Sequence, residues 1–121
     1  MNEYQEKLKC KMDVYVHYIY KISNNFPKSE LYGSVSQIRR SSLSVILNYI
    51  EGYARRKILI RINFLEISYA SLHESKYLLT FSLNEKYINK QEYDISNSMA
   101  EEIGAMLWKE IESLNKNYVI K

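Results

Sequence analysis

The stretch SQIRRSSLSVILNYIEG, residues 36–52, decides the fold of this chain. One set of apolar residues recurs in it every three or four positions, which is the spacing of one face of an α-helix. A second set, Leu43, Ile46, Leu47 and Ile50, lies off that face and covers much of the remaining circumference. Since a helix that is apolar on more than one side is buried on more than one side, the stretch predicts a helix packed among several others.

Composition agrees with a helical protein. The chain has 121 residues, of which 46% are hydrophobic, and only three are glycine and one is proline. This content is too apolar for a disordered chain and too poor in turn residues for a small all-β protein. We therefore expect one all-α domain over residues 1–121, long enough to bury a core of its own.

Apolar periodicity divides the chain into four helical segments. They are predicted over residues 2–23, from 27–29 to about 52, over 58–83, and from about 89 onwards. Short connections force neighbouring helices to run antiparallel, so the fold class is an up-down-up-down four-helix bundle. The residues predicted to face inward are Leu8, Met12, Tyr15, Ile19, Ile22, Leu31, Val35, Ile38, Ser42, Val45, Tyr49, Ile58, Ile62, Leu65, Tyr69, Leu72, Leu79, Leu83, Met99, Ile103, Met106, Leu107, Ile111, Leu114 and Tyr118.

Helix boundaries follow from the residues at each junction. Pro27 favours a helix start, so the second helix is expected to begin between Pro27 and Ser29. Gly52 is a suitable terminator, but no Ser, Thr or Asp follows it to cap the third helix. Asn89 with Glu92 three residues later is typical of a capping box at the start of the fourth helix.

Charge is distributed unevenly along the chain. Between residues 31 and 61 six cations, Arg39, Arg40, Arg55, Arg56, Lys57 and Arg61, face a single Glu51. Between residues 91 and 121 three lysines face six carboxylates: Glu92, Asp94, Glu101, Glu102, Glu110 and Glu112. Such asymmetry serves an anionic partner such as RNA, or it lets one helix pair with another within or between subunits.

Residues that would support catalysis or metal binding are few. His17 and His73 are the only histidines, and neither has the spacing of a zinc-protease helix or a di-iron bundle. Cys10 is the only cysteine, and no glycine-rich phosphate loop or serine nucleophile elbow is present. We expect no enzyme activity, metal, cofactor or small-molecule substrate. Ser41 and Ser42 are expected to pack closely or to bond to helix carbonyls.

The absence of a long apolar stretch bears on localisation. No segment approaches 18 uncharged apolar residues, and the charged N-terminus lacks the apolar core of a signal peptide. We therefore expect a cytoplasmic protein that does not insert into a membrane.

One stripe of the second helix has the composition of a subunit contact. Arg40, Leu47 and Glu51 share this stripe, with Asn48 beside it. In an oligomer the arginine of one subunit would meet the carboxylate of another. The alternative is an ordinary solvated face, in which Glu51 pairs with Arg55 of its own helix.

The same segment resembles a known family. FPKSELYGSVSQIRR (26–40) followed by NYIEGYARR (48–56) is similar to the FP-x-x-E-x-(Y/F)-G-x-x-x-Q-x-RR and N-x-x-EG-Y-x-R pattern of the 23S rRNA intervening sequence proteins. The resemblance extends more weakly to residues 64–74 and 106–114. The matching positions are Phe26, Pro27, Glu30, Tyr32, Gly33, Gln37, Arg39, Arg40, Ser44, Asn48, Glu51, Gly52 and Arg55.

The resemblance implies a closed four-helix bundle that associates with itself, commonly as a ring of five, without an established enzymatic activity. Related bundles bind nucleic acid through a basic surface. The chain departs from the family pattern at Ile46, where proline is usual, and in RRKILIRI (55–62), before the third helix.

Two functions remain open from the sequence. The first is a non-enzymatic homo-oligomer that binds RNA or DNA through the six cations of residues 31–61, which would attract phosphate with a strong salt dependence. The second is a structural assembly or adaptor protein in which the same arginines form ion pairs between subunits.

Overall fold

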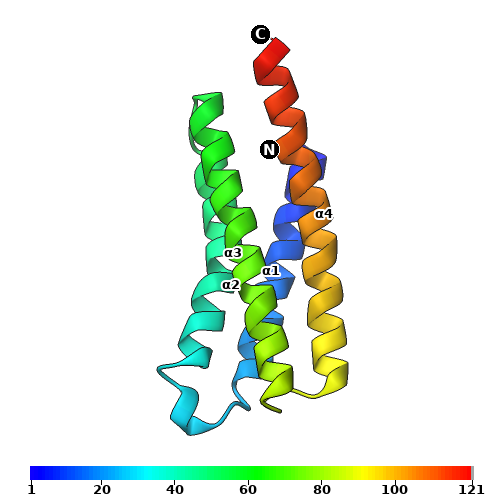
Figure 1. Cartoon of the computed structure of the whole chain (residues 1–121). Helices are drawn as coiled ribbons and strands as arrows, with labels where there is room; N and C mark the ends of the chain where they lie inside the picture. Colours follow the sequence, from blue (N-terminus) through cyan, green and yellow to red (C-terminus); the bar gives the residue numbers. More distant parts are fainter. Residues whose placement is uncertain (121) are drawn as a thin grey trace.

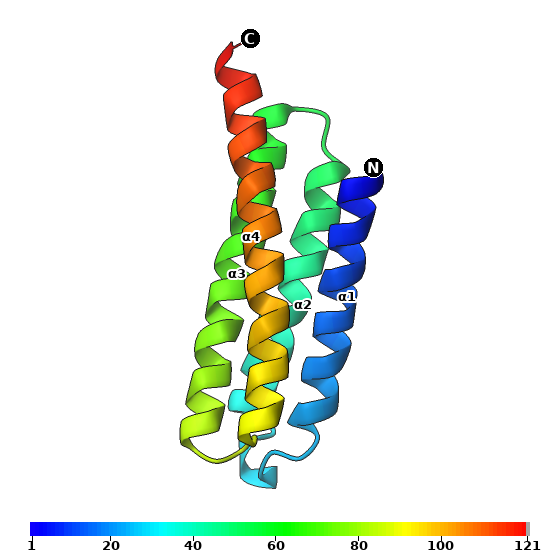
Figure 2. The ribbon, with the colours of Figure 1, turned by 90° about the vertical axis from the view of Figure 1, so that its right-hand side faces the viewer.

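The computed structural model describes residues 1–120, with side chains to residue 118. The elements are α1 (Glu3–Ser23), a short 3-10 helix η1 (Lys28–Glu30), α2 (Ser34–Tyr53), α3 (Ile58–Asn84) and α4 (Lys90–Ile120). Successive helices run in opposite directions, so the N-terminus and the α2–α3 loop share one end of the molecule (Figure 1). Figure 2 shows that the last turns of α4 extend beyond this end. The predicted all-α four-helix bundle is confirmed.

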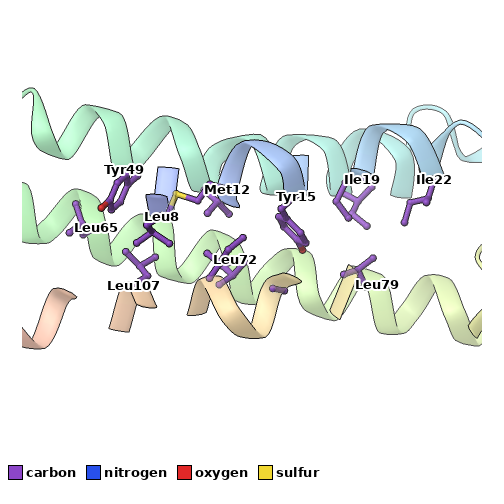
Figure 3. Packing of buried hydrophobic residues seen from close by; sticks show 14 of the residues in the cluster. Leu8, Met12, Tyr15, Ile19, Ile22, Tyr49, Leu65, Leu72, Leu79 and Leu107 are labelled. Atoms are coloured by element: carbon purple, nitrogen blue, oxygen red, sulfur yellow. The ribbon is translucent and has the colours of Figure 1, made fainter. Parts of the chain in front are cut away.

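Each helix contacts its two neighbours around a square. The contacts join α1 with α2, α2 with α3, α3 with α4, and α4 with α1. The predicted inward stripe of α1 is confirmed, because Leu8, Met12, Tyr15, Ile19 and Ile22 are all buried. Figure 3 shows these side chains directed toward the leucines of α3 and α4.

The core face of α3 alternates leucine with serine at heptad spacing. Its buried members are Leu65, Ser68, Leu72, Ser75, Leu79 and Ser82. The serines bond to nearby groups: Ser68 Oγ donates to the Val45 carbonyl of α2 at 2.6 Å, and Ser82 Oγ donates to the Leu78 carbonyl at 2.7 Å. Small, satisfied side chains at every second core position let neighbouring helices approach closely.

The helices α2 and α3 approach each other closely at Gly52. A Cβ atom built there would lie 2.6 Å from Leu65 Cδ1 and 3.2 Å from both the Arg61 carbonyl oxygen and Phe64 Cβ. Gly52 therefore lets the end of α2 rest directly on the first turns of α3.

Two buried tyrosines connect helices that are not neighbours. The Tyr15 hydroxyl of α1 lies 2.7 Å from Ser75 Oγ of α3, and burial raises the pKa of Tyr15 to about 12. Because Ser75 Oγ itself donates to the Leu72 carbonyl at 2.7 Å, Tyr15 is the donor of this bond. The Tyr49 hydroxyl of α2 donates to Glu110 Oε1 of α4 at 2.6 Å. One tyrosine thus spans each diagonal of the bundle.

The predicted start of the second helix was wrong. Only η1 follows Pro27, and α2 begins at Ser34, whose hydroxyl and backbone N–H donate to Glu30 Oε1 at 2.7 and 3.4 Å. Leu31 precedes the helix and is 50% exposed, so its assignment to the core was also wrong. The predicted terminator Gly52 lies one residue before the end of α2.

The remaining boundaries agree with the sequence. The capping box of Asn89 and Glu92 is confirmed by reciprocal bonds of 2.9 and 2.8 Å, and α3 begins after Lys57 without a side-chain cap. Of two predicted core tyrosines, Tyr69 is half-buried and packs against the core. Tyr118 is 45% exposed, so its assignment to the core was wrong.

We predict that Gly52→Ala lowers the free energy of unfolding by about 1–3 kcal/mol, because the added methyl group must displace Leu65 or separate the helices. Gly104→Ala is the matched control. Its Cβ would lie at an ordinary 3.4 Å from Leu72 Cδ2, so the gain in helix propensity should leave stability unchanged or raise it by up to about 1 kcal/mol. Urea unfolding followed by circular dichroism measures both; equal losses would contradict the close approach at Gly52.

Candidate nucleic-acid and assembly surfaces

Three consecutive cations form the loop between α2 and α3. Arg55, Arg56 and Lys57, here called the basic loop, are all exposed. Arg55 Nη2 pairs with Glu51 Oε1 at 2.5 Å, and its guanidinium lies 5.2 Å from the centre of the Phe64 ring. Among the described residues, Arg56 and Lys57 form no ion pair or side-chain hydrogen bond. The loop therefore presents two uncompensated charges at the end of the bundle.

Arg61 of α3 stabilises the basic loop by bonding to backbone carbonyls. Its Nε donates to the Gly52 carbonyl at 3.3 Å and its Nη2 to the Arg55 carbonyl at 2.8 Å. Its guanidinium lies 4.8 Å from the centre of the Tyr53 ring. Arg61 thus closes the α2–α3 junction and fixes the shape of the loop.

Arg39 and Arg40 lie near the other end of α2. Arg39 bonds to the end of α1, donating to Ser23 Oγ and Asn24 Oδ1 at 2.8 Å each and stacking 4.7 Å from the Tyr20 ring centre. Arg40 is exposed. Fifteen residues separate Arg40 from Arg55, which corresponds to about 22 Å along a helix. The six predicted cations therefore do not form one patch.

Lysines of α1 and α3 pair with the acidic residues of α4. Lys11 pairs with Glu102, and Lys76 Nζ lies 2.5 Å from Glu101 Oε1. These hydrogen-bonded lysines hold the pKa values of both carboxyl groups below their usual range. In the part of the chain that the structure describes, no arginine of α2 or α3 pairs with α4. The basic and acidic segments therefore do not neutralise each other within one chain.

Seven large apolar side chains are exposed on α2 and α3. Two of them are Leu59 and Tyr77 of α3, and the other five are here called the outer face: Leu43, Leu47, Ile50, Ile60 and Ile67. Leu47 is 54% exposed, the largest exposed fraction among these five side chains. The helices are joined beneath this face by a 3.0 Å contact between Ser44 Oγ and Ser71 Oγ.

The predicted contact residues have different surroundings on this face. Asn48 Nδ2 donates to the carbonyl and hydroxyl oxygens of Ser44 at 2.9 and 2.8 Å, so it serves its own helix. Glu51 is half-exposed and already pairs with Arg55, while Arg40 and Leu47 remain exposed. The intrachain Glu51–Arg55 pair foreseen as the alternative is therefore present.

Sequence analysis missed a buried polar cluster at the end of the bundle near the basic loop. Glu110 is only 7% exposed and accepts hydrogen bonds from the hydroxyls of Tyr49 and Tyr53. Burial, followed by the bonds to Glu110, raises the pKa of both tyrosines far above the usual value. The available signal was the position of Glu110, three residues after the inward-facing Leu107.

Two further observations concern metals and membranes. No group of three metal-ligating side chains comes together among residues whose side chains are described. Within residues 1–120, none of the helices combines the length and apolar character needed to cross a bilayer.

These features define a class: a small, all-helical bundle with an exposed apolar face and a cationic loop at its end. The sequence pattern of the 23S rRNA-intervening sequence protein family matches residues 7–109. The chain belongs to this family.

The chain is also similar to a solved structure. It is a protein with unknown function from the S23 ribosomal protein family of Bacteroides thetaiotaomicron VPI-5482, and it matches with a TM-score of 0.78 and 26% sequence identity. The match covers 86% of this chain and 97% of that chain. Comparison with curated proteins gives no match.

We predict that Arg39→Ala lowers the free energy of unfolding by about 1–2 kcal/mol, because it removes charge-assisted bonds that tie α2 to α1. Arg40→Ala, a neighbouring substitution with the same loss of charge, should change stability by less than about 0.5 kcal/mol. Thermal unfolding of both variants tests this, and equal effects would show that Arg39 has no special structural role.

Proposed function

We propose that this chain is a non-enzymatic protein that assembles with copies of itself through the outer face. We propose further that it binds nucleic acid through the basic loop, with RNA as the preferred partner. The observation that supports this most directly is the position of the basic loop at the end of the outer face. Copies that pack through α2 and α3 would bring several basic loops to one end of the assembly.

Assembly is supported by the exposed apolar side chains. Leu47 and Leu43 of α2 and Ile60 and Ile67 of α3 project from adjacent helices. A group of exposed apolar side chains is typical of a protein contact, since burying it removes unfavourable contact with water. A closed ring would bury this face in every copy, and we expect the ring of five that the family resemblance implies.

Nucleic-acid binding is supported by the charges that remain uncompensated. Lysines of α1 and α3 pair with Glu101 and Glu102 of α4, whereas Arg56 and Lys57 have no acidic partner among the described side chains. Repeating the basic loop around a ring would multiply weak phosphate contacts, and multivalent contacts raise the overall affinity without a new type of interaction.

The adaptor alternative rests on a different observation. Arg39 and Arg61 already bond within the chain, which shows that arginines here can serve structure. If Arg40 and Arg55 did the same between copies, the protein would be a purely structural assembly. The two functions differ in whether loss of charge at the basic loop affects nucleic-acid binding or assembly.

For assembly, we predict that the protein has a mass of several chains at micromolar concentration and that Leu47→Glu lowers it. A glutamate at this exposed site costs little in one chain but would place a charge inside the contact. Tyr77→Glu is the matched control, since Tyr77 is 67% exposed on α3 outside the outer face. Light scattering after size exclusion measures the mass; a monomeric wild-type protein would refute assembly, and an equal loss in both variants would refute this face.

For nucleic-acid binding, we predict that the wild-type protein binds structured RNA at low salt and releases it as salt rises. Arg56→Ala with Lys57→Ala should weaken binding and reduce the slope of log K against log salt by about two, without changing the oligomeric mass. Lys28→Ala with Lys86→Ala removes the same charge and should leave affinity nearly unchanged, because η1 and the α3–α4 connection, which carry these lysines, lie at the opposite end of the bundle (Figure 1).

The affinity of both double variants is measured by fluorescence anisotropy across a salt series, with RNA and DNA duplexes of one sequence. Absence of wild-type binding to either duplex at low salt would refute the nucleic-acid function. Dissociation of the oligomer by the basic-loop substitutions would favour the adaptor function instead.

A further inference from the structure

A polar cavity opens at the end of the bundle, where α1 begins and α4 approaches its end. Its volume is about 360 Å³, and its lining includes Tyr4, Gln5, Tyr53, Glu110, Ser113 and Asn117. The exposed side chains of Arg56 and Lys57 do not line it. The cavity is therefore a site separate from the surface proposed to bind nucleic acid.

Glu110 supplies the charge of this cavity. Its two carboxylate oxygens each accept one bond, from the hydroxyls of Tyr49 and Tyr53. An ionised carboxylate has about four acceptor positions, so the tyrosines leave about half of them unused. No lysine, arginine or histidine pairs with Glu110 among the residues whose side chains are described. A carboxylate that is 7% exposed thus has neutral donors but no opposite charge.

The walls of the cavity are held by bonds that do not involve Glu110. Asn2 and Gln5 form the reciprocal capping box of α1, and Gln5 Nε2 also donates to the Tyr53 hydroxyl at 3.2 Å. The Tyr4 hydroxyl of α1 donates to the Met106 carbonyl of α4 at 2.8 Å. The acceptor and the aromatic rings around it are therefore preorganised, which reduces the entropy lost on binding.

Nearby cations leave the charge of Glu110 available. Arg61 lies on the ring of Tyr53 and donates to the Gly52 and Arg55 carbonyls, and it does not line the cavity. Lys109 lines the cavity but forms no ion pair with Glu110. Because Lys109 repels each positive charge of a ligand, a ligand with one positive charge is repelled less than one with several.

We propose that this cavity binds a small organic cation with one primary ammonium or guanidinium group, whose N–H groups donate to Glu110 while its body contacts the ring of Tyr4. A single carboxylate beside neutral hydroxyls offers too few oxygen ligands for calcium or magnesium. Tyrosine rings attract an organic cation through their faces, and the amide of Asn117 and hydroxyl of Ser113 offer acceptors for further N–H groups.

Isothermal titration of the wild-type protein with n-butylammonium and with methylguanidinium tests the site. We expect saturable binding of one molecule per chain to at least one probe, and no binding of n-butanol, which has a similar body without the charge. Absence of saturation by both cations at millimolar concentration would overturn the proposal. Because none of these probes is a nucleic acid, this outcome is independent of the RNA measurement.

Variants locate the binding. Glu110→Gln keeps the shape but removes the charge, and it should weaken binding about tenfold or more. Glu112→Gln is the matched control, because Glu112 is exposed on the same helix and does not line the cavity. Equal affinity of the Glu110→Gln and wild-type proteins would overturn the site.

A second variant tests the proposed site if the Glu110→Gln protein does not fold. Ser113→Lys changes an exposed residue three positions from Glu110 and brings an ammonium group of the chain itself into the cavity. We expect it to fold, to lose binding of both probes and to raise the melting temperature. Unchanged binding by a folded Ser113→Lys protein would place the probes elsewhere and refute the proposal.

Discussion

The close packing of α2 against α3 is the contact on which the rest of the structure depends. It requires glycine at position 52 and small residues along the interface, where Ser44 meets Ser71 and Ser68 bonds to the Val45 carbonyl. Leu43, Leu47 and Ile50 recur at helical spacing on the side of α2 away from the buried Val45 and Tyr49, so they remain exposed on the outer face. The short connection between α2 and α3 is the basic loop.

Charge within the chain is arranged so that this loop stays positive. The carboxylates of α4 lie beside α1 and α3, where Lys11 and Lys76 pair with them. Arg39 and Arg61 are used to hold α2 against its neighbours. The acidic segment is thus partly neutralised by lysines of other helices, and in the basic segment only Arg55 pairs with a carboxylate, Glu51. Among the described residues, Arg40, Arg56 and Lys57 form no ion pair.

The two buried tyrosines place hydrogen bonds inside an otherwise apolar core. Tyr15 reaches Ser75 across one diagonal and Tyr49 reaches Glu110 across the other. A hydrogen bond across a diagonal restricts how two helices slide past each other. Apolar contacts alone restrict this sliding less. At one end this arrangement also brings a carboxylate into the core beside a polar cavity.

The sequence by itself determined the class of fold, because helical periodicity and the scarcity of glycine and proline reflect local backbone preferences and burial. It also determined the inward face of α1, the capping box at Asn89 and the pair of Glu51 with Arg55, which depend on residues three or four positions apart. Only the tertiary structure decided which arginines are available to an outside partner. Arg39 bonds to residues of α1 that are distant in the sequence, and Arg61 bonds to carbonyls that the α2–α3 loop folds back toward it. It likewise decided the start of α2 and the burial of Glu110, since a charged side chain on an apolar stripe is stable only when another helix supplies its hydrogen-bond donors.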